Sequence, residues 1–236
     1  MGIKTLALIT ARGGSKRIPG KNIKLFLGVP IISYSIAAAL GARCFDEVMV
    51  STDDSEIAEI AKSFGAKVPF LRSEHNSCDY ATTVDVIEEV ITKYKEMGMN
   101  FKHFCCIYPT APFITEERLI ECMKLLRESG ADSVLPIVRF SYPIQRSLKL
   151  EDGRLGMFWP ENYNKRSQDL EPAYHDAGQF YCMKVESFLR QKRLFADYTL
   201  PIILNESEVQ DIDTEEDWRI AEMKYRFLKN NGHDRK

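Results

Sequence analysis

The first 45 residues contain no aspartate or glutamate, although the chain of 236 residues carries a net charge of only −2. The acidic residues gather near the other end, where residues 206–222 hold eight of them and a single arginine. A net charge this close to zero argues against nucleic acid or an anionic membrane as the main partner. We therefore expect a basic front and an acidic back that meet around a metal-bound phosphate.

Long apolar runs, paired cysteines and clustered histidines are missing as well. No apolar run approaches the roughly 18 residues of a membrane span, and the run near the N-terminus ends before Arg12, which predicts no signal peptide. The six cysteines form no C-x-x-C pair and mostly sit among apolar residues, so we expect reduced core thiols. Four scattered histidines give no zinc site. These features predict a soluble, cytoplasmic protein.

Residues 11–24, ARGGSKRIPGKNIK, follow an apolar run, Leu6–Ile9, that predicts a first buried strand. Gly13 and Gly14 let the backbone turn sharply and expose its N–H groups. Thirteen positions hold five cations, which are Arg12, Lys16, Arg17, Lys21 and Lys24. The pattern predicts a cradle for a polyphosphate, with a solvated basic loop as the alternative. The spacing fits neither G-x-x-x-x-G-K-[ST] nor G-x-G-x-x-G, and the lack of the second motif argues against an NAD-linked oxidoreductase.

The rest of the chain alternates between strand and helix patterns. Strands are expected at Phe45–Val50, Lys67–Leu71, His103–Tyr108, Asp132–Val138 and Thr199–Leu204. Helices are expected at 30–40, 55–64 and 84–97, after a Thr115 cap, and after a Thr214 cap. Asp53 and Asp54 are most simply explained as helix caps, with direct ligand contact as the less favoured alternative. The alternation predicts one α/β domain, residues 1–236, with a Rossmann-like, mixed but mainly parallel sheet flanked by helices.

The alternation stops between about residues 140 and 176, and the segment from Ala173 to Tyr181 is expected to return to the sheet. A hairpin is expected before that return, turning at Asp152 and Gly153, followed by the aromatic residues Phe158, Trp159 and Tyr163. An excursion that carries large aromatic side chains needs a surface to pack against. That surface is either its own subunit, which the excursion would cover as a lid, or a second subunit.

A candidate metal site lies near the C-terminal end. Asp211 and Asp213 alternate about the apolar Ile212, so an extended backbone points both carboxylates to one side. Mg²⁺ takes few protein carboxylates and completes its shell with water and phosphate oxygens. Together with the basic segment at the front, this pair predicts a magnesium site at Asp211 and Asp213.

The segment ARGGSKRIPGKN resembles the signature loop of the CMP-sugar acid synthetases, or acylneuraminate cytidylyltransferases, which have a nucleotidyltransferase fold and join CTP to sialic acid and related sugars. The resemblance covers nearly the whole chain and is strongest at 9–24, 108–113, 174–181 and 209–218. It implies that the triphosphate of CTP is contacted by Arg12, Ser15, Lys16, Lys21 and the amides of Gly13 and Gly14. Asn22 would orient the loop or the nucleotide.

The same resemblance assigns the segment RSEHNSCDYATT, residues 72–83, to the cytosine ring. Arg72 and Thr83 are the candidates for base recognition, and Asp79 would help to hold the loop. Thr83, with Asp79 and Thr82, could equally serve as the N-terminal cap of the next helix.

The sugar side of the site departs from the common pattern of the family, because Tyr108 stands where a glutamine is usual. The segment H-D-A-G-Q-F-Y, residues 175–181, resembles most closely the members specific for pseudaminic acid and makes Asp176, Gln179 and Tyr181 candidates for sugar binding with Tyr108. The resemblance also implies a homodimer, in which the excursion completes the neighbour's pocket. Its basic residues, Arg146, Lys165 and Arg166, would grip the carboxylate of the sugar.

We therefore expect a Mg²⁺-dependent enzyme that converts CTP and pseudaminate into CMP-pseudaminate and pyrophosphate, with Arg12, Lys21 and Asp211 as catalytic residues. The general base stays open. The alternatives are a synthetase for N-acetylneuraminate or a related nonulosonate, and a non-catalytic nucleotide-binding module. A synthetase for the eight-carbon acid KDO is disfavoured, because that group has a Q-G-D-E-P type segment where this chain has Tyr108-Pro-Thr-Ala-Pro.

Overall fold

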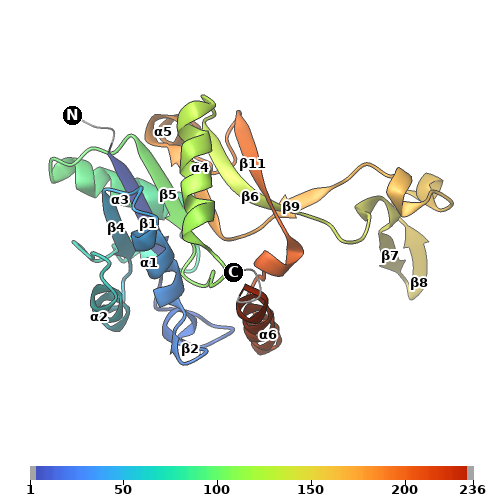
Figure 1. The fold of residues 1–236 in the computed structure, drawn as a ribbon, viewed down its shortest axis with the longest axis horizontal. Coiled ribbons are helices and arrows are strands. Elements are labelled where there is room, and N and C mark those ends of the chain that lie inside the picture. The colour runs from blue at the N-terminus through green and yellow to red at the C-terminus, as the bar shows by residue number, and fades with distance from the viewer. Residues whose placement is uncertain (1–3, 233–236) are drawn as a thin grey trace.

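The computed structural model of the protein describes residues 4–232 and is organised around one large sheet (Figure 1). The strand order is β11-β6-β10-β5-β1-β4, and β9 also pairs with β6. The seven strands are β1 (Thr5–Thr10), β4 (Glu47–Ser51), β5 (His103–Ile107), β6 (Ser133–Arg139), β9 (Tyr174–Asp176), β10 (Phe180–Lys184) and β11 (Thr199–Leu204). Strand β1 lies next to the edge strand β4 and is parallel to both of its neighbours, β4 and β5.

The sheet is mixed, as the sequence predicted, because two strands run against the others. Strand β10 lies between β5 and β6 and is antiparallel to both, and β9 is antiparallel to β6. Strands β6 and β11 are parallel to each other. The sequence pattern predicted a return to the sheet after residue 173, but not the insertion of β10 into its middle.

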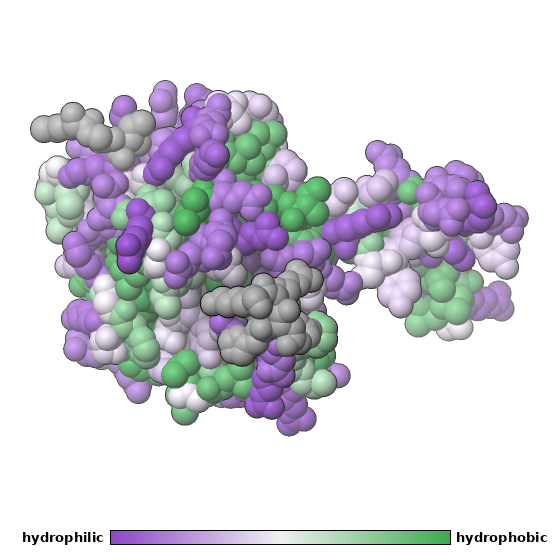
Figure 2. All heavy atoms as spheres, in the orientation of Figure 1, coloured by the Kyte–Doolittle hydropathy of each residue, from purple (hydrophilic) through white to green (hydrophobic). Residues whose placement is uncertain are grey.

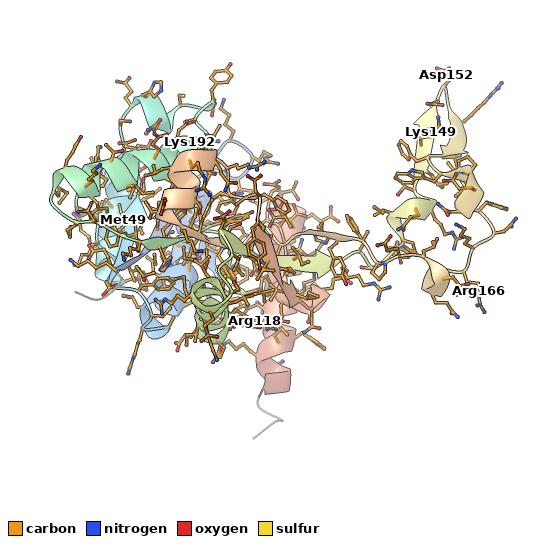
Figure 3. All side chains as sticks on the ribbon, turned by 90° about the horizontal axis from the view of Figure 1, so that it is seen from above. Met49, Arg118, Lys149, Asp152, Arg166 and Lys192 are labelled. Carbon is orange, nitrogen blue, oxygen red and sulfur yellow. The ribbon has the colours of Figure 1, made fainter. Side chains whose placement is uncertain are left out.

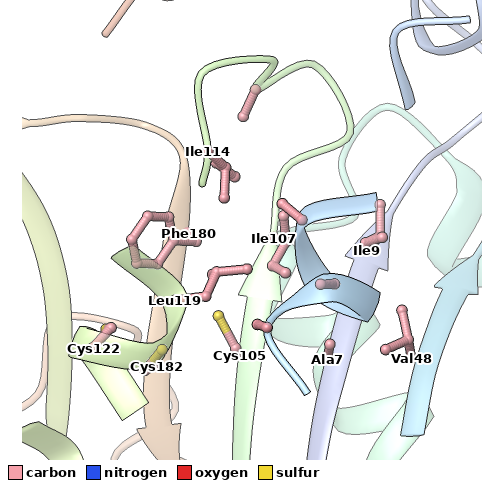
Figure 4. Close-up of a cluster of buried hydrophobic side chains, with 14 of the residues drawn as sticks. Ala7, Ile9, Val48, Cys105, Ile107, Ile114, Leu119, Cys122, Phe180 and Cys182 are labelled. Carbon is pink, nitrogen blue, oxygen red and sulfur yellow. The ribbon is translucent and has the colours of Figure 1, made fainter. Parts of the chain in front are cut away.

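Helices cover both faces of the sheet. They are α1 (Ile32–Gly41), α2 (Ser55–Ser63), α3 (Thr83–Glu96), α4 (Glu116–Glu128), α5 (Val185–Gln191) and α6 (Glu215–Gly232). Ala7 and Ile9 of β1 pack in a cluster with buried residues of α1, α2 and α4, part of which Figure 4 shows. Leu6 and Leu8 pack in a second cluster with residues of α3 and α5. Because both faces of β1 are buried, its sequence is a continuous apolar run.

The cysteines do not form disulfides among the described residues, which agrees with the prediction of reduced thiols. Four of them are buried, Cys105, Cys106, Cys122 and Cys182. Three of these four belong to the cluster of Figure 4, where they act as small apolar side chains.

A third apolar cluster joins the two ends of the chain. It contains Ile18 and Phe26 from the front, Ile212 from the segment that leads into α6, and Trp218 from α6 itself. The rings of Phe26 and Trp218 are 5.7 Å apart in an edge-on arrangement. This cluster lies beneath the basic front segment and fixes it against α6.

Two predicted elements are wrong in detail. Pro30 belongs to a small hairpin, β2 (Leu25–Phe26) and β3 (Val29–Pro30), and helix α1 begins only at Ile32. The amide of Ile31 donates to the carbonyl of Lys24 at 3.0 Å and closes this hairpin. The strand predicted at Lys67–Leu71 is a single bridge between Lys67 and Met49, because Pro69 has no N–H group with which to extend the pairing.

The excursion projects from the body of the protein as an arm (Figures 1 and 3). It carries the predicted hairpin, β7 (Leu148–Glu151) and β8 (Arg154–Met157), which turns at Asp152 and Gly153 with φ of 49° and 74°. Figure 2 shows hydrophobic side chains gathered on one side of the arm. Within residues 4–232, no helix has the length and apolar character needed to cross a membrane.

Candidate active site

The basic segment that follows β1 is residues 11–24 and is here called the front loop. It lies at the carboxyl end of the parallel strands β4, β1 and β5. The amide of Ala11 donates to the carbonyl of Ser51 at 3.0 Å, which continues the pairing of β1 with β4. The amide of Gly13 donates to Oδ1 of Asp53 at 3.0 Å. Loops at this edge of an open α/β sheet are where ligands bind.

The two glycines of the front loop have different requirements. A Cβ atom on Gly13 would lie 2.8 Å from Oδ2 of Asp54, whereas Gly14 has open space around it. Gly13 therefore allows a close approach to the N-cap of α2, rather than a positive φ. Because its amide is already bonded to Asp53, the predicted phosphate contact of this amide would require that bond to be exchanged.

Asn22 and Lys21 hold the front loop from inside. Asn22 is buried, and its Nδ2 donates to the carbonyl of Arg12 at 2.8 Å. Through this contact Asn22 holds the backbone of the loop, and a role toward the nucleotide stays a prediction. Lys21 Nζ donates to the carbonyl of Ile212 at 2.6 Å and lies 3.5 Å from Oδ1 of Asp213. The front loop and the Asp211–Asp213 segment therefore meet, as the charge distribution of the sequence predicted.

A cavity of about 350 Å³ opens between the front loop and residues 72–83. Seven of the nine residues predicted to bind the nucleotide line it, namely Arg12, Ser15, Lys16, Lys21, Asn22, Arg72 and Thr83. Gly13 and Gly14 line a neighbouring hollow on the outer side of the loop. The structure thus brings most of the predicted nucleotide residues to one place.

Arg72 is the buried cation of this cavity. Its Nη2 donates to the carbonyl of Ser51 at 2.6 Å, and its Nε donates to the Ser51 hydroxyl at 3.1 Å. Burial lowers the pKa of the Arg72 guanidinium, and the charge of nearby Asp53 opposes that shift. Arg72 is therefore held rigidly at the end of β4, with the remainder of its guanidinium available to the cavity.

The segment after Arg72 is fastened to α3 by a residue that the sequence analysis missed. The Glu89 carboxylate accepts from the amide and hydroxyl of Ser73, both at 2.8 Å, and from Nδ2 of Asn76 at 2.6 Å. Lys93 completes the set at 2.6 Å. Although burial alone would raise the pKa of Glu89, these donors lower it to about 2. The signal available in the sequence was an acidic residue within the helix expected at 84–97, on the side that faces the protein.

Thr82 and Asp79 close the other end of this segment. Thr82 forms a reciprocal capping box with Asp85 at the start of α3, so Thr83 is the first helical residue rather than the cap. Asp79 is ion-paired with Lys16 and with Arg12, whose Nη1 lies 3.3 Å away. The Lys16 ammonium, with help from Arg12, lowers the pKa of the Asp79 carboxyl. Asp79 therefore links its segment to the front loop, and its predicted role in holding the segment around the nucleotide stays a prediction.

A second cavity, of about 470 Å³, shares Tyr108 with the first. Two predicted sugar residues meet there, because the Tyr181 hydroxyl donates to Oδ2 of Asp176 at 2.6 Å. The rings of Tyr108 and Tyr181 are 5.5 Å apart. Burial, with the neighbouring Tyr108 and Asp176, raises the pKa of Tyr181. The hydroxyl therefore stays protonated as a donor.

Gln179 lies elsewhere. Gln179 is buried, and its side-chain Nε2 donates to the carbonyl of Glu208 at 2.7 Å. Its main-chain carbonyl accepts from the amide of Tyr108 at 2.8 Å. It lines neither the 350 Å³ nor the 470 Å³ cavity. In this structure Gln179 positions Tyr108 and the turn at 206–208, so a direct sugar contact stays a prediction.

The proposed metal ligands have the predicted alternation. Ile212 is buried in the third apolar cluster, Asp211 is exposed and Asp213 is half-buried. Asp213 accepts from Arg17 at 2.7 Å as well as facing Lys21. No group of three or more possible metal-ligating side chains occurs within residues 4–232. Two carboxylates suit an ion that takes its other ligands from a triphosphate and water, so the residues present fit Mg²⁺.

The arm residues are remote from both cavities in a single chain. Arg166 lies on the arm, as Figure 3 shows. Its Nε is 2.8 Å from Oδ2 of Asp169. Arg146 lies in a short 3-10 helix, Ile144–Arg146, of the same arm. Neither residue lines the cavities around Tyr108. A single chain in this structure therefore does not bring them to the cavity, and their contact with the sugar stays a prediction.

A cation-lined cavity at the carboxyl edge of a mainly parallel sheet, beside a carboxylate pair, defines a nucleotide-binding α/β protein. The family model described as "Cytidylyltransferase" matches residues 6–212. The chain belongs to this cytidylyltransferase family.

Two curated relatives and one solved structure resemble the chain. It is 41% identical to a pseudaminic acid cytidylyltransferase of Campylobacter jejuni, over 95% of this chain and 97% of that protein. It is 34% identical to a CMP-N,N'-diacetyllegionaminic acid synthase of Legionella pneumophila, over 93% and 95%. CMP:2-keto-3-deoxy-manno-octonic acid synthetase complexed with CTP is similar in fold, with a TM-score of 0.68 at 16% identity over 96% and 99% of the two chains.

Proposed function

We propose that the protein transfers CMP from CTP to a nine-carbon acid sugar, and that this sugar is pseudaminic acid. The observation that carries the proposal is the shared wall at Tyr108, which joins a cation-lined cavity to the cavity of Tyr181 and Asp176. A triphosphate in the first cavity and a sugar in the second would place a hydroxyl next to the α-phosphorus. The Campylobacter relative named for pseudaminic acid supports this sugar.

The reaction needs positioning and charge neutralisation rather than a covalent intermediate. The anomeric hydroxyl oxygen attacks the α-phosphorus, a new P–O bond forms, and the bond from that phosphorus to the oxygen bridging to the β-phosphate breaks. Arg12, Lys16 and Lys21 line the cavity and would stabilise the negative charge of the departing pyrophosphate. The base that accepts the hydroxyl proton stays open.

Asp211 and Asp213 would hold Mg²⁺. When bound, the ion would neutralise the α-phosphate and lower the pKa of the attacking hydroxyl. The ion pairs of Asp213 with Arg17 and Lys21 keep this carboxylate beside the front loop. The buried Ile212 anchors the segment, so the two carboxylates are presented from a fixed backbone.

The arm would complete the sugar cavity of a second copy, as a homodimer. Its hairpin exposes Leu148, Leu150 and Leu155 by 57%, 71% and 73%, more apolar surface than a free arm would leave in water. Arg146 and Arg166 would then reach the sugar carboxylate of the neighbour, together with Lys165.

Subunit complementation tests the shared site. Lys21→Ala and the double variant Arg146→Ala/Arg166→Ala are each expected to be inactive alone. Refolding them together should restore about one quarter of the wild-type rate, because half of the random dimers contain one intact site out of two. No restored activity in a mixture that does form mixed dimers would show that the arm serves its own subunit.

We place the reaction in the cytoplasm. The cysteines of the described part of the chain are free thiols, and four of them are buried in the core. Reduced thiols are the usual state in that compartment. The nucleotide substrate would also be available there.

The central experiment measures pyrophosphate release with CTP and Mg²⁺, using pseudaminic acid, N-acetylneuraminic acid and KDO in parallel. Release with pseudaminic acid alone is the expected result. Release only with another acid would keep the chemistry and overturn the assignment of the sugar. An absence of release with all three, in protein that binds CTP, would favour the non-catalytic module.

A further inference from the structure

Every cation of the front loop is already paired with a carboxylate. Three of them meet the acidic segment before and at the start of α6, since Arg17 and Lys21 face Asp213 and Lys24 meets Glu215 at 2.7 Å. The other two, Arg12 and Lys16, are both paired with Asp79. Three carboxylates of the protein itself thus partly neutralise the five cations of the loop, from two directions.

Asp79 differs from Asp213 and Glu215 in how it is held. The segment that carries it is anchored at its base, where Ser73 and Asn76 bind Glu89. Its tip is exposed, with the Asp79 side chain 46% and the adjacent Tyr80 92% accessible to solvent. The carboxylate can therefore leave the two cations by a movement of the tip alone, while the base of the segment at Ser73 and Asn76 stays bound to Glu89.

The position of Asp79 conflicts with the role of its partners. Arg12 and Lys16 line the nucleotide cavity, and their charges are needed by the phosphates. A triphosphate brings more negative charge and more acceptor oxygens than one carboxylate, so it would displace Asp79 from the two cations. Because Asp79 is always present, this displacement lowers the net affinity for the triphosphate. Asp79 can also pair with the two cations again when pyrophosphate leaves.

We infer that Asp79 is a resident counter-ion of the front loop, which holds Arg12 and Lys16 when no triphosphate is bound, yields them to CTP, and takes them back as pyrophosphate departs. The identity of the anions rests on the proposed function. In this role Asp79 weakens the ground-state binding of polyphosphates and so favours the release of pyrophosphate in each turnover. It is a positioning residue, because it acts through the two cations.

The test measures binding of inorganic pyrophosphate by isothermal titration calorimetry to the wild type and to Asp79→Asn. Removing the charge of a solvent-exposed competitor is expected to tighten binding by about two- to fivefold, the range set by exposed ion pairs. The inhibition constant of pyrophosphate and the KM for CTP should fall by the same factor. A merely structural role predicts the opposite, weaker binding through a loosened loop.

Two further variants make the result specific. Asp79→Glu retains the charge and should bind pyrophosphate like the wild type. Glu74→Gln changes the net charge equally on an exposed residue of the same segment, for which no ion pair occurs among the described residues, and should leave binding unchanged. Unchanged or weaker binding by Asp79→Asn would overturn the inference, as would equal tightening by Glu74→Gln. Asp79→Ser replaces Asp79→Asn if the latter fails to fold.

The outcome can be separated from the proposed function, because pyrophosphate binding requires no sugar. Wild-type turnover with pseudaminic acid together with unaltered binding by Asp79→Asn would remove the counter-ion role and keep the function. Tighter binding by Asp79→Asn in a protein that turns over none of the three sugars would do the reverse.

Discussion

Replacing Glu89 by glutamine should loosen the wall of the nucleotide cavity and destabilise the protein. The carboxylate accepts four hydrogen bonds, two on each oxygen, from Ser73, Asn76 and Lys93. A glutamine side chain of the same shape has only one acceptor oxygen, so its NH₂ group would face two donors. Losing two such bonds, one of which can be the charged pair with Lys93, costs about 2–3 kcal/mol.

The pKa of Glu89 gives a second value. A decrease from 4.5 to about 2 corresponds to about 3 kcal/mol at 1.36 kcal/mol per unit. Because the side chain keeps some contact with water, we take about 2 kcal/mol as the expected loss at pH 7. The folded-state pKa is the lower one, so this stabilisation is complete above about pH 4.5 and is lost as the pH falls towards 2.

The assay is urea unfolding at pH 7 and at steps down to pH 3, together with the KM for CTP. Glu89→Gln should be less stable than the wild type by about 2 kcal/mol at pH 7, with a difference that shrinks in acid. The KM for CTP should rise several-fold. The neighbouring Glu88→Gln is the matched control, since Glu88 is 45% exposed and pairs only with Lys192 on the surface. Equal stability of Glu89→Gln and the wild type at pH 7 would refute the anchoring role.

Three further substitutions test other parts of the site. Asp211→Ala should abolish Mg²⁺-dependent pyrophosphate release while CTP still binds, and wild-type rates would remove Asp211 from the metal site. Lys21→Ala loses its contacts with Ile212 and Asp213 and should lower kcat/KM by about 100-fold; an unchanged value would exclude Lys21. Leu155→Glu places a charge on the exposed apolar side of the arm and should yield monomers by light scattering. Persistent dimers would locate the interface elsewhere.

The sequence predicted the elements whose signals are local. The apolar run of β1 identified a strand buried on both faces, and Asp54, Thr115 and Gly65 mark helix ends as expected. Strand β10 was recognised, but its place between β5 and β6 depends on pairing over a long sequence separation, for which no local pattern exists. The two-residue strands of the β2–β3 hairpin are too short to show any periodicity.

The candidate site divides in the same way. The cations of the front loop are visible in the sequence, whereas the acceptors that hold them are not, because Asp79 lies 67 residues from Arg12 and Asp213 lies 192 from Lys21. Gln179 comes directly before β10, so strand alternation does not fix the direction of its side chain. Glu89 follows the same rule, since an acid on a helix becomes an anchor only when a distant loop returns to it.

The third apolar cluster has a consequence for the order in which the molecule is completed. The front loop leaves the ribosome first, yet Ile18 and Phe26 need Ile212 and Trp218 from the opposite end of the chain as packing partners. Lys21 likewise finds its acceptor only when residue 212 has been synthesised. Strands β1, β4 and β5 can pair earlier, whereas β6 needs β10, which lies between it and β5. A nascent chain that lacks α6 has no apolar partner beneath its front loop. Competence to bind the nucleotide should therefore arise only after α6 has been synthesised, in one step with its docking.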